Sequence, residues 1–176
     1  MARKQRTRSI DIEIDKLTNS IELIATGEVF DTQVVGLNIL HRPVIKKKDW
    51  RFNWRKELEQ QDRKVYALVT VADPRVLQGL ICLMDGGDHV LVHLVESARF
   101  NQGRNKAYAG VPANLFAFAC RRSFQLGHDG VVAFISKTKL IAHYQKMLDA
   151  QILGGTRMSI GTPAALKLVT RYFPLP

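Results

Sequence analysis

The chain has 176 residues, 46% of them hydrophobic, which is typical of one globular domain and too apolar for a disordered chain. No apolar run approaches the roughly 20 residues of a membrane span, and the basic start of the chain is not followed by the apolar segment of a secretory signal. Its 26 Lys and Arg residues against 16 Asp and Glu residues give a formal charge of +10, which attracts nucleic acid, an anionic membrane surface or a phosphate-rich ligand.

Two cysteines, Cys82 and Cys120, fall inside apolar segments. Buried free thiols in a reducing compartment explain them, so we expect a cytoplasmic protein. Because no Cys or His cluster has the spacing of metal ligands, we expect no metal.

In the first third of the chain, we expect a basic mobile arm over residues 1–9, followed by a single domain over residues 10–176. Strict alternation over residues 10–14 predicts a strand. An apolar run over residues 34–40 predicts another, which ends at His41-Arg-Pro43.

Residues 46–58 interleave Trp50, Phe52 and Trp54 with cations. Such a mixture can form a stacking platform for single-stranded nucleic acid. It can equally anchor the segment to the core by its tryptophans while the cations stay solvated. Propensity predicts a short helix at about residues 54–61.

From residue 64 the pattern becomes regular. Residues 65–71 and 76–84 read as strands, and two adjacent glycines in residues 85–88 predict a hairpin turn. Residues 90–95 are apolar almost throughout, which predicts a central strand buried on both faces.

The connection from residue 95 to residue 131 has the length of a crossover between parallel strands. Its helix should begin near Pro112, which fits a first helical turn, and should end before Gly127. Leu115, Phe118 and Leu126 belong to the stripe expected to face the sheet. A strand over residues 131–135, a helix over residues 139–148 and a hairpin of residues 150–160 and 165–173 complete the chain.

A helix that starts after a basic, glycine-containing loop offers its first amides and the positive end of its dipole to an anion. Gly110 permits close approach of the backbone. The donors expected to contact a pyrophosphate are the amides of Ala109, Gly110, Val111, Ala113 and Asn114. A plain crossover with a glycine turn is the alternative.

The order of elements from residue 64 to residue 173, the loop at residues 107–112 and the helix sequence Ala142-His-Tyr-Gln-Lys-Met-Leu148 resemble the acetyl-CoA-binding core of GNAT-type N-acetyltransferases. Only Gly110 matches the family's phosphate loop strictly, and Leu148-Asp149 replaces the Gly-Phe of the family helix. The resemblance implies an α/β (α+β) fold with a mostly antiparallel central sheet, flanking helices and a parallel strand pair at the cofactor site.

The resemblance also implies site residues. Tyr144 aligns with the tyrosine that protonates the leaving thiolate, and Glu96 is the best-placed base for the amine. Val95 would bind the pantetheine through its backbone, while Arg104, Lys106 and Lys137 would contact the phosphates. Alternatives stay open: Tyr144 can be a core tyrosine, Glu96 can pair with Arg99 or Arg104, and His93 ranks below Glu96.

The expected function is transfer of an acetyl group from acetyl-CoA to an amine by direct attack. The charge favours an anionic acceptor, with the aminoacyl end of a charged tRNA among the candidates. We expect no membrane partner, and homodimer formation is left open. A non-catalytic nucleic-acid-binding module and a CoA-sensing protein on the same fold are the alternatives.

Overall fold

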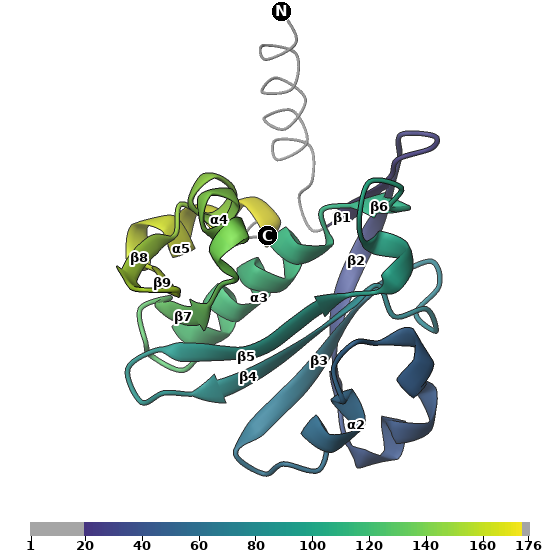
Figure 1. Cartoon of the computed structure of the whole chain (residues 1–176), viewed down its shortest axis with the longest axis horizontal. Helices are drawn as coiled ribbons and strands as arrows, with labels where there is room; N and C mark the ends of the chain where they lie inside the picture. The colour runs from purple at the N-terminus through teal and green to yellow at the C-terminus, as the bar shows by residue number, and fades with distance from the viewer. Residues whose placement is uncertain (1–19, 174–176) are drawn as a thin grey trace, which may run out of the picture.

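The computed structural model describes residues 20–173 (Figure 1). The arm predicted over residues 1–9 and the strand predicted over residues 10–14 lie outside this range. In chain order the elements are β1 (Ser20–Leu23), β2 (Glu28–Leu37), the 3-10 helices η1 (Ile39–Val44) and η2 (Lys47–Asp49), α2 (Trp54–Glu57), β3 (Arg63–Thr70), β4 (Gly79–Asp85), β5 (Val90–Ser97), η3 (Arg99–Asn101), β6 (Tyr108–Ala109), α3 (Val111–Gln125), β7 (Val132–Ile135), η4 (Thr138–Leu140), α4 (Ile141–Leu148), β8 (Gln151–Gly154), β9 (Arg157–Ile160) and α5 (Thr162–Tyr172).

These strands form one sheet in the order β6-β1-β2-β3-β4-β5-β7-β9-β8. Every pair is antiparallel except β5 with β7, which are joined through α3. The predicted mixed, mostly antiparallel sheet with one parallel pair is therefore confirmed. Within residues 20–173, no helix is long and apolar enough to cross a membrane.

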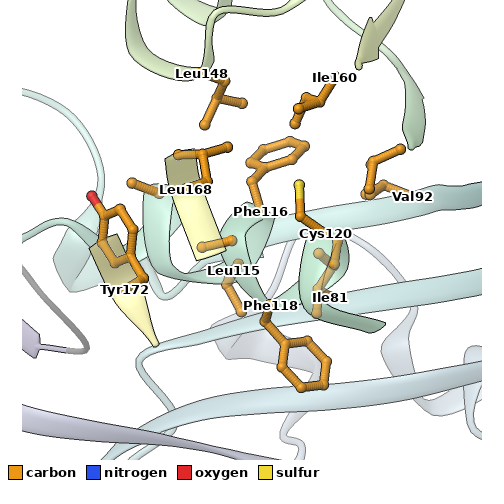
Figure 2. Close-up of a cluster of buried hydrophobic side chains, with 14 of the residues drawn as sticks. Ile81, Val92, Leu115, Phe116, Phe118, Cys120, Leu148, Ile160, Leu168 and Tyr172 are labelled. Atoms are coloured by element: carbon orange, nitrogen blue, oxygen red, sulfur yellow. The ribbon is translucent and has the colours of Figure 1, made fainter. Parts of the chain in front are cut away.

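The larger core lies between the sheet and α3. Gly110, whose φ of +95° lies in the left-handed region, is the N-cap residue just before this helix, and Pro112 occupies its first turn. Gly127 follows the last turn with φ +81°, so both predicted ends are confirmed. Figure 2 shows side chains of α3 between those of the sheet and α5. The buried members that it labels are Ile81, Val92, Leu115, Phe116, Phe118, Cys120, Leu148, Ile160, Leu168 and Tyr172.

A close approach of α3 to β4 depends on Gly79. A Cβ added there would lie 2.7 Å from Cγ1 of Val111 and 3.0 Å from Cδ1 of Leu115. The first turn of α3 is therefore held directly against the strand that precedes β5.

A smaller core covers the opposite face of the sheet, where the 3-10 segments and α2 lie (Figure 1). Trp50 and Trp54 are its largest members, with exposed fractions of 6% and 1%, and their rings meet edge to face. The anchoring interpretation of these tryptophans is confirmed. Both cysteines are buried and unpaired, and burial raises the pKa of each thiol to about 12.

The structure corrects the predicted end of the chain. The hairpin is formed by β8 and β9, whereas residues 162–172 form the helix α5. Its buried residues Ala164, Ala165, Leu168 and Tyr172 have helical spacing. The alternation of residues 166–172 was misleading because two of the buried positions are alanines, which carry little hydrophobic signal.

Other bounds differ less. β2 ends at Leu37, and the predicted strand end becomes η1, whose backbone is capped by the side chain of Asn38. α2 is one turn, shorter than predicted, and β4 begins at Gly79. β5 is a central strand, but it is not buried on both faces as predicted, since His93 is exposed. The prediction that Leu126 faces the sheet is wrong, because its side chain is 41% exposed.

Candidate active site

The parallel strands β5 and β7 pair over a short stretch and then separate. Val90, Leu91 and Val92 pair with Val132, Ala133 and Phe134, and no further pairs follow. At the same point β5 carries a β-bulge, because Leu83 pairs with Val92 whereas its neighbour Cys82 pairs with Leu94. His93 is the extra residue. A bulge bends its strand, so it fits the place where β5 turns away from β7.

A cleft of about 270 Å³ lies where the two strands separate. Its walls come from the second half of β5, the end of β7, the helices α3 and α4, and the segment before α2. The lining residues that concern the chemistry are Arg51, Phe52, Val95, Glu96, Phe116, Lys137 and Tyr144.

The backbone of Val95 faces this cleft. Ala98 donates its N–H to the carbonyl oxygen of Gln78 at 2.9 Å, so the residues of even number from Leu94 onward are the ones that exchange backbone hydrogen bonds with β4. The N–H and C=O groups of Val95 and Ser97 must then point toward the side that β7 has left. Main-chain donors thus line the cleft at the position predicted for Val95.

Tyr144 extends from α4 into the cleft wall. Its ring packs against Phe116 and Phe134, with centroids 5.4 and 5.2 Å away. Burial raises the pKa of the phenol, because desolvation disfavours the phenolate. No other residue in the described part of the chain hydrogen-bonds its hydroxyl. This phenol keeps its proton and can donate it to an atom in the cleft.

Glu96 is 7% exposed and is held by donors from a distant segment. Its Oε1 accepts the N–H of Arg51 at 2.6 Å, and its Oε2 accepts the N–H of Phe52 at 3.2 Å and Nε1–H of Trp54 at 2.7 Å. It forms no ion pair with Arg99 or Arg104 among the described residues. The carboxylate therefore lines the cleft and also fixes Arg51 and Phe52 at its edge.

The start of α3 brings only some of the predicted amides to a free helix end. Asn114 N–H donates to the carbonyl oxygen of Gly110 at 3.1 Å, and Ala109 belongs to β6, which pairs with β1. Val111 and Ala113 remain as first-turn donors without a helical partner, although both residues are buried. The side chain of Asn114 donates to the carbonyl oxygens of Ser20 and Gly110, both at 2.8 Å.

The three predicted phosphate-binding cations lie in the loop before β6 and in the segment after β7. Two causes lower the pKa of His143 in α4. Burial is the larger, and the positive charge of nearby Lys106 is the second. Lys137 lines the cleft just after β7, and Arg104 is exposed in the loop before β6. No group of three or more His, Cys, Asp or Glu residues that could hold a metal occurs in residues 20–173.

No protein-family model and no curated protein matches the sequence. Solved structures do resemble the fold. AtaTR bound with acetyl-CoA has a TM-score of 0.54 at 14% identity, over 78% of this chain and 98% of its own. The spermidine/spermine N-acetyltransferase SpeG of Vibrio cholerae has a TM-score of 0.57 at 12% identity, over 77% of this chain and 96% of its own. A GNAT-family acetyltransferase of Staphylococcus aureus Mu50 has a TM-score of 0.52 at 8% identity, over 74% of this chain and 99% of its own.

This chain has the GNAT fold. At identities of 8–14% the likeness concerns the fold and carries no site residue with it. In this chain the cleft lies where β5 and β7 separate.

The sequence did not reveal Arg51 and Phe52 as cleft residues. Their place depends on hydrogen bonds to Glu96, which is 45 residues from Arg51 and 44 residues from Phe52 along the chain. The aromatic and basic composition of residues 46–58 indicated a special segment. Its partner on β5 had no local signal.

Proposed function

We propose that the protein is an acetyl-CoA-dependent N-acetyltransferase with Tyr144 as general acid. The observation that carries this is the cleft between the parting strands, with the main chain of Val95 on one wall and the protonated phenol of Tyr144 on the other. The acetyl-CoA in a structure of the same fold supports the choice of acyl donor.

In the proposed reaction the amine nitrogen attacks the thioester carbonyl carbon. The Val95 N–H polarises the carbonyl oxygen as negative charge develops on it. The carbon–nitrogen bond forms, the carbon–sulfur bond breaks, and the departing thiolate takes the proton of Tyr144. The proton lost by the amine passes to Glu96, the one carboxylate among the cleft residues. A base is required because an alkylammonium with a pKa near 10 is mostly protonated at neutral pH.

The cofactor phosphates would lie at the start of α3. The amides of Val111 and Ala113, the left-handed backbone at Gly110 and the cations Arg104, Lys106 and Lys137 are the groups proposed to hold them. Pro112 contributes no amide, and the amides of Ala109 and Asn114 are less favourable than the sequence suggested.

Calorimetric titration with acetyl-CoA and with desulfo-CoA tests the proposal. Both should bind, and Gly110→Asp should abolish binding because it adds a carboxylate beside the phosphate position. Gly87→Asp is the matched control, since Gly87 also has positive φ (+89°) but lies in the distant β4–β5 turn. Absence of binding to the unaltered protein contradicts the function, and binding by Gly110→Asp contradicts the phosphate site.

A CoA-binding protein without transfer is a second candidate. It is favoured by Glu96, because both oxygens of this carboxylate already accept hydrogen bonds. Binding of acetyl-CoA without release of free thiol in the presence of any amine would select this candidate.

A further inference from the structure

An ammonium acceptor has two protons to lose, and the proposed function gives a place to one of them. The first proton must leave before the attack, because an alkylammonium with a pKa of about 10 has no free electron pair at neutral pH. The second leaves as the carbon–nitrogen bond forms. Since one carboxylate takes one proton, Glu96 cannot receive both. A cationic acceptor therefore requires a second proton acceptor in the cleft.

His93 is the cleft residue, among those that the structure describes, that can take this proton. The ionisable residues of the lining are Arg51, His93, Glu96, Lys137 and Tyr144. Arginine and lysine are cations at neutral pH, and Tyr144 keeps its proton because burial raises its pKa. Histidine is the side chain whose ordinary titration lies near neutral pH. The side chain of His93 is 35% exposed, so it can also return a proton to solvent.

The β-bulge of β5 places His93 beside a cluster of charged side chains. Its Nε2 lies 2.8 Å from Nη1 of Arg63. Because a guanidinium only donates hydrogen bonds, Nε2 must accept, so the free electron pair of the neutral ring lies on Nε2 and its proton on Nδ1. Arg63 is in turn bonded to Oε2 of Glu57 and Oδ1 of Asp62, both at 3.0 Å. These bonds fix the orientation and the tautomer of the imidazole.

The same cluster can hold the imidazolium. Glu57 and Asp62 contribute two negative charges and Arg63 one positive charge, so a proton on His93 neutralises the group. Oε2 of Glu57 lies 3.6 Å from Nε2 of His93 and is the acceptor for an Nε2–H bond. The thiol of Cys82 contacts that oxygen at 3.8 Å and stays protonated, because burial, and then the charge of Glu57, raises its pKa to about 12.

We propose that His93 is a catalytic residue that takes the first proton of an alkylammonium acceptor. The proposal rests on the proposed function. The ammonium takes the place of Arg63 at Nε2, while Arg63 stays bonded to Glu57 and Asp62. One N–H bond of the ammonium breaks, its electron pair stays on nitrogen, and the proton binds Nε2. The free pair attacks the thioester, the second proton passes to Glu96, and the imidazolium of His93 returns its proton to solvent.

Two simple acceptors test this role at neutral pH with acetyl-CoA, by release of the CoA thiol corrected for the uncatalysed rate. Ethylamine is cationic under these conditions, whereas methoxyamine is neutral and needs no first deprotonation. His93→Gln should lower kcat/KM for ethylamine about 100-fold and leave kcat/KM for methoxyamine within about twofold. An equal loss for both amines, or no loss for ethylamine, would overturn the proposal.

The pH profile gives a second readout that a structural defect would not produce. With ethylamine, kcat/KM of His93→Gln should keep rising toward the amine pKa of about 10, because only the free amine then reacts. The unaltered protein should reach its plateau near neutral pH. Profiles of the same shape for the two proteins contradict the role of His93.

The controls separate the imidazole from its surroundings. His89→Gln is the matched control, since His89 also contacts a carboxylate, Asp88 at 2.6 Å, but lies in the β4–β5 turn outside the cleft; neither amine should respond to it. Glu57→Gln removes the acceptor for the imidazolium, so Glu57 is a positioning residue. This variant should slow ethylamine about tenfold and spare methoxyamine. Equal slowing of both amines would contradict that role.

The geometry is tested without acetyl-CoA, by ¹⁵N NMR of the histidine rings. The neutral ring of His93 should carry its proton on Nδ1, and Arg63→Met should remove this preference. A proton on Nε2 in the unaltered protein overturns the proposal. Absence of thiol release with either amine contradicts the acetyltransferase function, whereas thiol release that His93→Gln lowers equally for both amines contradicts the role of His93 alone.

Discussion

The two faces of the sheet are built by different means. On the face of α3, a large set of apolar side chains fills the space between helices and strands. On the opposite face the core is small, and one carboxylate, Glu96, holds the backbone of Arg51 and Phe52 through hydrogen bonds. The wall that carries Tyr144 is therefore stabilised by buried area, whereas the wall formed by Arg51 and Phe52 is stabilised by a few directional hydrogen bonds.

The largest expected effect is on the helix-covered face. Phe116→Ala should lower the free energy of unfolding by about 3–5 kcal/mol, because Phe116 is fully buried and packs on Phe134 and Tyr144. Urea denaturation measures the loss. Phe52→Ala is the control on the other face and should change stability by less than about 0.5 kcal/mol. Similar losses for the two variants would remove the contrast.

Tyr144→Phe tests whether the helix-covered face supplies the acid. Turnover should fall by about 100-fold or more, since the thiolate would leave without a proton donor. Affinity for acetyl-CoA should stay the same because the ring and its packing are kept. Steady-state kinetics and calorimetry give the two values, and unchanged turnover would exclude Tyr144 from the mechanism.

Glu96→Ala tests the face of the sheet on which Glu96 holds the backbone of Arg51 and Phe52. It should cost about 1–3 kcal/mol of stability, because the buried Nε1–H of Trp54 and the partly buried N–H of Arg51 lose their acceptor. Hydrogen exchange should accelerate at the amides of Arg51 and Phe52 while the amides of α3 remain protected. Glu96→Gln, which keeps one carbonyl oxygen, should lie between the two proteins. Uniform acceleration throughout the chain would show that the faces are not separate.

The smallest effect concerns pH. Burial raises the pKa of Tyr144, so its proton is lost only as pH rises through a value above the ordinary phenol pKa of about 10. The stability that the neutral phenol contributes is complete below that ordinary pKa and declines above it. Turnover limited by this acid should therefore persist up to pH 10, and a pH profile with Tyr144→Phe as reference checks it. Loss of the acid below pH 9 would contradict its burial.

Much of the fold could be predicted from local patterns. The strands β3, β4, β5 and β7 have regular apolar patterns, and Pro112 and Gly127 mark the ends of α3. α5 could not be predicted because the alanines on its buried side left Leu166 and Leu168 to suggest a strand. Tyr144 was named from a single segment of the sequence and lies in the wall of the cleft, while its role stays a prediction. The partners of Glu96 depend on tertiary packing across more than 40 residues, which no local pattern records.

The pairing of β6 with β1 has a consequence for the order in which the molecule assembles. The side-chain amide of Asn114, in the first turn of α3, donates to the carbonyl oxygen of Ser20 across 94 residues, and the segment before α3 is itself a strand of the sheet. Contacts of such long range form slowly, because a large loop must close first. A growing chain can close this contact only after residue 114 has been made, when the residues of β1 to β6 are already present. The phosphate site proposed at the start of α3 depends on this long-range closure.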